Sequence, residues 1–200
     1  MTRPRRYGDV GQAFPIYITV VGGLLFLALA YFAVGQATVN RSGAQTAADA
    51  AALAAAQDRR DQLAGEWVKD VLDPTKWQQV FDGVGQELRP PCRRAYELAS
   101  QNDAHVLDCG PSGPLAYTVD VETNKTMGKS VVPITESKRS KAHAEAVITR
   151  RCEFKPLPVN AGSDALPRLT CKDGKYWDLD PKDLTDLPKP QDLFDVHLVD

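Results

Sequence analysis

Charge is missing from one long stretch near the start of this chain. No Asp, Glu, Lys or Arg occurs from Val10 to Asn40, although charged residues make up 25% of the 200 residues. The chain also lacks the basic excess of a nucleic-acid-binding protein, because 24 Lys and Arg face 26 Asp and Glu. A hydrophobic content of 43% is too high for an intrinsically disordered chain. This distribution indicates a membrane protein with a soluble part.

The uncharged stretch contains an apolar run, Ala13–Gly35, that is long enough to cross a bilayer. An α-helix rising about 1.5 Å per residue spans about 35 Å over this run, and the hydrocarbon core is about 30 Å thick. A cleaved signal peptide is the alternative, with Ala33–Ala37 as its cleavage site. Signal peptides have shorter apolar cores of about 7–15 residues, so a retained transmembrane helix over 13–35 is the favoured interpretation.

The residues on either side of the run predict its orientation. Three Arg and one Asp precede it, whereas Arg41 and then the acidic Asp49 follow it. Basic residues stay preferentially on the cytoplasmic side of a membrane. We therefore expect a single-pass protein of the cell membrane, with residues 1–12 in the cytoplasm and residues 36–200 outside it.

Cysteine is scarce, and no CxxC pair occurs among the four cysteines, so a zinc ribbon or a thioredoxin-like site has little support. An even number of cysteines in an exported domain predicts two disulfides. The simplest pairing joins Cys92 to Cys109 and Cys152 to Cys171. Three pairings are possible, and the spacing does not decide among them.

Beyond the run the chain is rich in alanine, the strongest helix former, and contains no proline before Pro74. We expect the membrane helix to continue as an Ala-rich extension over residues 36–73. Asp73 and Pro74 have the residue types of an N-cap and first position of a new helix. A further helix is predicted from Pro91 to Asn102.

The remaining sequence alternates between apolar and polar residues. This pattern predicts strands over residues 105–109, 115–122, 143–154, 166–171, 175–179 and 194–199. Gly110–Gly113 and Asp173-Gly174 have the composition of turns. The predicted fold class is α+β: a long N-terminal transmembrane helix with its Ala-rich extension, then a small antiparallel sheet domain over 74–200 with short helices and two disulfides.

Small side chains line one face of the Ala-rich extension. Ala48, Ala51, Ala52 and Ala55 follow the i, i+3, i+4, i+7 spacing of a single helix face. Small residues allow a second helix to approach closely, so these four alanines are the predicted helix-packing residues. A flexible helical spacer is the alternative interpretation of the same composition.

The segment GAQTAADAAALAAA (Gly43–Ala56), directly after the membrane helix, resembles the signature of TadE/TadG-like proteins of bacterial Flp (tight-adherence) pilus systems. The likeness extends over about residues 8–58. This whole segment is similar to TadG-like proteins of actinomycete type. It implies a pseudopilin-like or pilus-assembly protein of the cell envelope. Its partners would be the membrane and the helices of other pilus-assembly or pseudopilin proteins.

The chain departs from the pattern of pilins that prepilin peptidase processes. Those proteins are cut after a glycine and carry Glu five residues later. Here Ala13 stands at that distance from Gly8, and Ile16 at that distance from Gly11. A membrane-retained, TadG-like component is therefore expected rather than a processed subunit.

Signals for chemistry are weak. No GxSxG, HExxH, Walker A or GxGxxG motif occurs, so we predict no enzyme activity, catalytic residue, cofactor or metal site. The alternatives were a nucleophile at Ser112, calcium at the aspartates of DGKYWDLDPKD, and contact of a lysine-rich stretch with anionic envelope polymers. The aspartates considered for calcium are Asp173, Asp178, Asp180 and Asp183. The basic residues of the lysine-rich stretch are Lys129, Lys138, Arg139 and Lys141. The favoured interpretation of the aspartate cluster is a solvated turn, and that of the lysine-rich stretch is an exposed loop.

Two functions remain open from the sequence. The first is a non-enzymatic envelope component that acts through helix packing and protein–protein contact in pilus assembly or surface adherence. The second is a membrane-tethered binding module whose helix is only a stalk. Neither the oligomeric state nor the ligand of the exported domain follows from the residues.

Overall fold

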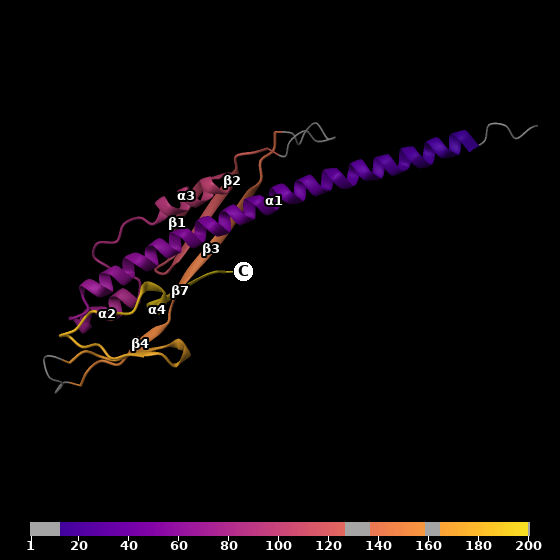
Figure 1. The fold of residues 1–200 in the computed structure, drawn as a ribbon. Coiled ribbons are helices and arrows are strands. Elements are labelled where there is room, and N and C mark those ends of the chain that lie inside the picture. The colour runs from indigo at the N-terminus through magenta and orange to yellow at the C-terminus, as the bar shows by residue number, and fades with distance from the viewer. Residues whose placement is uncertain (1–12, 127–136, 159–164, 200) are drawn as a thin grey trace, which may run out of the picture.

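The computed structural model describes residues 13–126, 137–158 and 165–199. The basic residues before the apolar run, and the glycines considered for peptidase cleavage, lie outside this part. One helix, α1 (Ala13–Lys69), leads into an α+β domain, as predicted (Figure 1). The helices that follow are α2 (Pro74–Phe81), α3 (Cys92–Gln101) and α4 (Pro190–Leu193). The strands are β1 (Ala104–Gly113), β2 (Ala116–Thr123), β3 (Lys141–Arg150), β4 (Cys152–Phe154), β5 (Leu169–Cys171), β6 (Tyr176–Trp177) and β7 (Phe194–Leu198).

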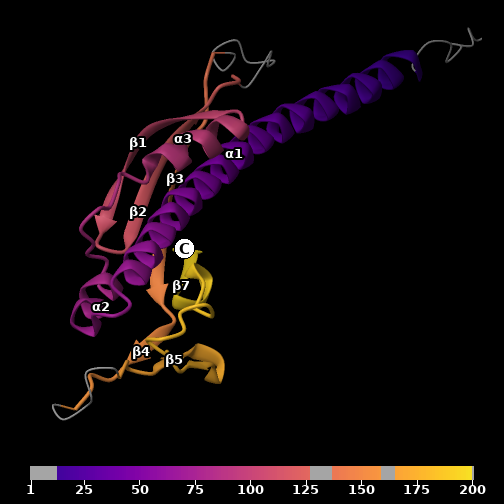
Figure 2. The ribbon, with the colours of Figure 1, turned by 60° about the vertical axis from the view of Figure 1, so that its left-hand side comes forward.

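Helix α1 continues without a break for 57 residues, because no proline follows Pro15 within it and the Gly22-Gly23 pair does not interrupt it. Its C-terminal half crosses one face of a four-stranded antiparallel sheet with the order β1-β2-β3-β7, and its N-terminal half extends beyond the domain (Figures 1 and 2). Helix α3 lies beside α1 and contacts β1. Together α1 and α3 cover the apolar face of the sheet.

The alternation of buried and exposed residues along β2 and β3 shows which face of the sheet α1 and α3 cover. Tyr117, Val119 and Val121 of β2 are buried at every second position, and Ala144 and Ala146 of β3 match them in register. Side chains of a strand alternate between the two faces of a sheet, so these residues point to one side. They form one core with the buried residues of α1.

The corner between α1 and α2 follows the predicted signals. Asp73 caps α2 by accepting a hydrogen bond from the backbone N–H of Thr75, and Pro74 occupies the first turn. After α2 the chain turns at Gly83, whose φ of +88° favours glycine. A Cβ there would also lie 2.7 Å from the carbonyl oxygen of Pro114. Glycine at this position thus allows the α2 end and the β1–β2 hairpin to meet.

Two details of the strand prediction were wrong. The predicted strand over 143–154 is two strands, β3 and β4, in different sheets. Between them the Arg151 N–H donates to Leu193 and its carbonyl accepts from Lys172, so the backbone leaves the large sheet here. The segment Gly110–Gly113 is not a turn, because β1 continues through it and the hairpin turns at residues 114–115. An edge strand such as β1 tolerates the proline that this segment contains.

A second, three-stranded sheet, β4-β5-β6, lies at the end of the domain away from the N-terminal half of α1 (Figure 1). Its β5–β6 turn coincides with the predicted Asp173-Gly174 signal. A chain of aromatic contacts joins this sheet to the helices: Trp67 lies 5.3 Å from Trp77 between ring centroids, and Trp77 lies 5.3 Å from Phe154. Phe81 continues the chain to Phe194, 5.4 Å away.

Candidate interaction surface

The N-terminal half of α1 is an apolar surface that the rest of the described chain leaves uncovered. Its large side chains are exposed, from Phe14 to Val39, with Tyr31 at 83% and Phe26 at 72% of their full exposure. Within the described residues, α1 is the one helix long and apolar enough to cross a membrane, and no residue of its most apolar window is buried. Exposed apolar area on this scale marks a membrane or protein contact.

The four predicted helix-packing alanines lie in the other half of α1 and are already packed within the chain. Ala48, Ala51, Ala52 and Ala55 are all 0% exposed and belong to the core shared with the sheet. Helix α3, with Ala95 and Ala99 buried, packs alongside α1, and β3 contributes further small residues. Small residues on both sides allow this close approach.

The sequence predicted that a helix of another protein packs on these alanines. In the structure, the chain's own sheet and α3 occupy that face. The predicted boundary at residue 74 also differs from the packing of the domain. The core begins at Ala44, and Leu63 and Trp67 of α1 are among its largest buried side chains. Sequence periodicity identified a packing face, but it contains no information about which neighbour covers that face.

Both predicted disulfides are present, with the simplest of the three pairings. Cys92–Cys109 joins the N-terminus of α3 to β1, and Cys152–Cys171 joins residues directly opposite each other in β4 and β5. The first bridge holds α3 against the large sheet, and the second holds the small sheet together. All four cysteines are paired, so no free thiol is present.

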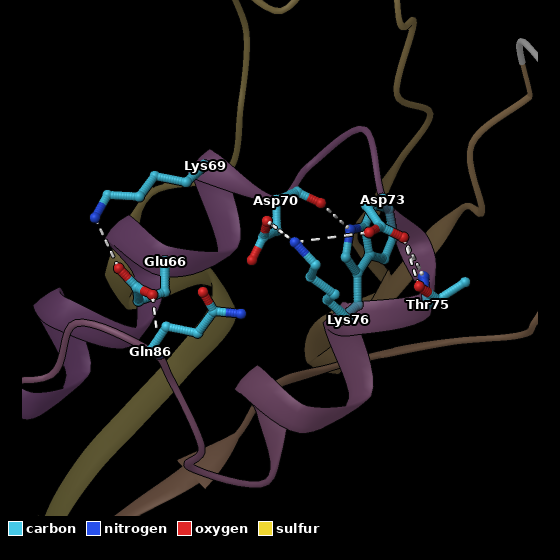
Figure 3. A network of polar contacts seen from close by, with 8 residues as sticks. Glu66, Lys69, Asp70, Asp73, Thr75, Lys76 and Gln86 are labelled. Atoms are coloured by element: carbon cyan, nitrogen blue, oxygen red, sulfur yellow. Dashed lines mark hydrogen bonds and ion pairs between the residues drawn. The ribbon is translucent and has the colours of Figure 1, made fainter.

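A polar network stabilises the corner where α1 meets α2 (Figure 3). Glu66 is 6% exposed and accepts hydrogen bonds from Lys69, at 2.8 Å, and from the backbone N–H of Gln86, at 3.2 Å. The bond from Lys69 is the main cause that lowers the pKa of Glu66, and burial acts in the opposite direction. Glu66 and Glu87 together raise the pKa of Lys69 above its ordinary range.

The second part of this network lies at the start of α2. Lys76 reaches Asp70 at 2.8 Å, which raises the pKa of Lys76. The Thr75 hydroxyl donates to Asp73 at 2.5 Å and lowers the pKa of that carboxyl. The indole N–H of Trp77 donates to the backbone carbonyl of Asp70. These contacts satisfy groups at the end of α1 and have a structural role.

The residues considered for chemistry lie in separate places. Ser112 donates a hydrogen bond to Glu145 at 2.5 Å, with no histidine in the pair, and both are on the exposed side of the sheet. The three histidines each face a different carboxylate: His105 faces Glu122, His143 faces Asp120, and His197 faces Asp195.

The aspartates of the C-terminal turn are engaged in local hydrogen bonds. Asp178 binds Arg168, Asp180 accepts from the Lys182 N–H at 2.8 Å, and Asp183 accepts from the Thr185 hydroxyl at 2.6 Å, which lowers the pKa of Asp183. The side chain of Asp173 lies outside the described part. Across the described residues, no group of three or more His, Cys, Asp or Glu has an arrangement that could hold a metal ion.

A hollow of about 550 Å³ lies where the exposed half of α1 meets the domain. We call it the basal notch, and its lining residues are Tyr31, Phe32, Gly35, Val39, Asn40, Lys125 and Thr126. The helix contributes the apolar wall, and the segment that follows β2 contributes the lysine and threonine. A second hollow, of about 650 Å³, lies along α1 between Thr38 and Thr46 and is closed by residues 101–103.

Sequence reasoning did not identify the basal notch. Tyr31 was recognisable as an interfacial aromatic residue at the end of an apolar run, and the lysines near residue 138 were recognisable as an exposed group. Lys129 of that stretch lies outside the described residues. That Lys125 lies beside Tyr31 and Phe32, almost a hundred positions away, follows only from how the hairpin of β2 and β3 lies on α1.

Comparisons with known proteins bear on the N-terminal quarter of the chain. Residues 11–58 match the family described as "Putative Flp pilus-assembly TadE/G-like". No curated protein and no solved structure matches the chain. The matched residues contain the exposed apolar half of α1 and the alanines that begin the domain core, and the match supports a relationship of this chain to the TadE/TadG-like family.

Proposed function

We propose that this protein is a single-pass, membrane-anchored component of a bacterial Flp-type pilus assembly or adherence system. The observation that carries the proposal is the uncovered apolar half of α1, in a segment that matches the TadE/G-like family. An apolar helix surface of this length is stable in hydrocarbon, where its backbone hydrogen bonds are satisfied within the helix. The domain that follows would be held at the membrane surface by a continuous helix.

The orientation is part of the same proposal. Basic residues precede the span, and positively charged flanks favour the cytoplasmic side. The two disulfides are consistent with a domain on the oxidising, extracytoplasmic side. Residues 1–12 would then be cytoplasmic and the domain extracytoplasmic. As a TadG-like protein without the peptidase pattern, the chain would stay in the membrane rather than enter the filament.

Protein–protein contact would use the membrane half of α1, because the alanine face of the other half is buried in the chain's own core. In this mechanism the exposed half packs against helices of other pilus-assembly proteins inside the bilayer. The burial of the alanine face also favours the second candidate, a binding module for which the helix is only a tether. No catalytic step is part of either function.

A helix exchange separates these two functions. Residues 13–35 are replaced by an unrelated membrane-spanning helix of the same length, and the variant is expressed in a strain from which the native gene is deleted. Under the proposal, the variant reaches the membrane but does not restore surface pili, while the native chain does. Full restoration by the variant would show that the helix is only a tether.

Protease treatment of intact spheroplasts tests the orientation. The domain should be digested from outside while an epitope placed before residue 13 stays protected. Digestion of that epitope with protection of the domain would reverse the orientation. A chain released from membranes by alkaline carbonate would contradict membrane anchoring itself.

A further inference from the structure

The basal notch has two chemically different walls, arranged in a defined order along α1. Tyr31, Phe32 and Val39 supply the apolar wall from the end of the membrane run. Asn40, with Lys125 and Thr126 from the segment that follows β2, supplies the polar rim. From Tyr31 to Asn40 the helix rises about 14 Å at about 1.5 Å per residue, so the apolar side lies nearer the bilayer centre.

This order matches that of a phospholipid at a membrane surface, where acyl carbons lie below and the phosphate lies above. The apolar run ends at Gly35, so residues 31–40 pass from the hydrocarbon into the headgroup region if the run spans the bilayer. Tyrosine is enriched at that boundary. The notch thus lies at the depth where a lipid would fit both walls.

The strand ends beside the notch carry an excess of positive charge. Residues 122–126 and 138–141 include four basic side chains and one carboxylate: Lys125, Lys138, Arg139 and Lys141, and Glu122. Glu122 lies 3.7 Å from Arg139 and 3.8 Å from Lys141, and it also faces His105 at 3.5 Å. With Asp103, which pairs with Lys125, two described carboxylates face these four basic side chains, so this edge keeps an excess of positive charge that attracts anions of a membrane surface.

Lys125 is available to an anion despite its ion pair. It contacts Asp103 at 2.7 Å, but the two side chains are 76% and 70% exposed. An ion pair this exposed contributes little free energy, because both charges are well solvated. A lipid phosphate can therefore take the place of Asp103, and the Thr126 hydroxyl and the Asn40 amide lie on the same rim as further donors.

We propose that the basal notch and its basic strand ends bind an anionic phospholipid of the leaflet that faces the domain. Its phosphate binds Lys125, and an acyl chain lies against Tyr31, Phe32 and Val39. The bound lipid fills the hollow between helix and hairpin and holds the domain against the membrane surface. This inference rests on the proposed membrane anchoring and adds a lipid preference to it.

The test uses the full chain in vesicles of phosphatidylcholine alone or of phosphatidylcholine and phosphatidylglycerol in equal parts. All native cysteines are in disulfides, so a cysteine in an Asn124→Cys variant can be labelled selectively with a fluorophore. Asn124 is exposed beside Lys125 and does not line the notch. Quenching of the fluorophore by a nitroxide on the lipid headgroup reports how closely this corner approaches the surface.

The expected result is a quenching at least twice as strong in the phosphatidylglycerol vesicles as in phosphatidylcholine alone. Adding Lys125→Glu should abolish this difference, and high salt should reduce it, since exposed charges are screened. The matched control is Lys172→Glu, the same charge change on an exposed lysine in the β5–β6 turn, which should leave the difference intact.

Equal quenching in the two vesicles would overturn the proposal, as would a phosphatidylglycerol effect that survives Lys125→Glu. Alkaline carbonate extraction of the same vesicles separates this failure from that of the proposed function. A chain that resists extraction but shows no lipid preference remains an anchored protein without the lipid site. A chain that carbonate releases is not anchored at all.

Discussion

Residues 14–35 and residues 44–67 belong to the same unbroken helix, yet the first set is exposed and the second contributes much of the domain core. The first half carries large apolar side chains around its whole circumference. The second carries mainly alanines where it crosses the sheet, with Leu53 among them, and its largest buried side chains, Leu63 and Trp67, lie toward its end. The comparison teaches that one continuous helix can serve two environments: the uncharged half with exposed apolar side chains suits hydrocarbon, and the half with small apolar and charged residues packs on a domain in water.

The largest difference between the halves should appear on removing one aromatic side chain from each. Trp67→Ala takes a fully buried ring out of the aromatic chain that joins α1, α2 and β4. We expect a loss of about 3–5 kcal/mol in the free energy of unfolding of the domain. Phe26→Ala, at an exposed position of the membrane half, should change it little. Urea unfolding of the full chain in detergent micelles, followed by near-UV circular dichroism, measures both.

Removal of the Cys92–Cys109 disulfide tests whether this bridge stabilises only the domain half. Replacing Cys92 and Cys109 together by alanine should lower the free energy of unfolding by about 3 kcal/mol, because a loop of this size is no longer closed in the unfolded chain. The membrane half should remain helical and resist carbonate extraction. Thermal unfolding under non-reducing conditions gives the first quantity, and loss of membrane insertion would contradict the separation of the halves.

Enlarging an alanine tests the burial of the predicted packing face. Ala52→Phe should lower the free energy of unfolding by about 1–3 kcal/mol, because the sheet and α3 leave no room for the ring. The matched change Ala30→Phe lies on the exposed half and should leave domain stability unchanged. If Ala52→Phe left stability intact and instead disrupted binding of a partner protein, the alanine face would be intermolecular after all.

The smallest expected effect is the pH dependence from Glu66 at the end of α1. Its lowered pKa means that the folded state favours the carboxylate, so the stability that Glu66 contributes is fully present above the ordinary pKa of a glutamate in the unfolded chain. It is lost as the pH falls through the lower, folded value. Glu66→Gln should therefore flatten the acid side of the stability curve in urea titrations between neutral and acidic pH. Parallel curves for the two proteins would contradict this role.

Local signals in the sequence predicted much of the fold. The cap at Asp73, the turn at Gly174 and the alternation in β2 each depend on neighbouring residues, and each was predicted correctly. The two errors have different causes: Gly110–Gly113 is paired with the nearby strand β2 despite its turn-like composition, whereas the break between β3 and β4 involves distant partners. The break at Arg151 depends on bonds to Leu193 and Lys172, which no local pattern reveals.

The candidate site also has one part that is visible in the local sequence and another that depends on contacts between distant segments. The apolar run is visible directly, because transfer of uncharged side chains into hydrocarbon depends on composition alone. The basal notch is not visible, since Lys125 and Tyr31 come together only after the hairpin has packed on α1. The alanine face was recognised as a surface for close approach, but its neighbour was assigned to another protein instead of to α3 and the sheet.

By itself, the amino-acid sequence determined a long N-terminal helix, its apolar half, an α+β class and the number of disulfides. These follow from propensity, transfer free energy and cysteine chemistry, which act residue by residue or between near neighbours. Only the tertiary structure decided that the core begins inside the helix at Ala44 and that Lys125 and Tyr31 line one hollow. Those features arise from contacts between segments far apart in the chain, where the shape and burial of many side chains select one arrangement.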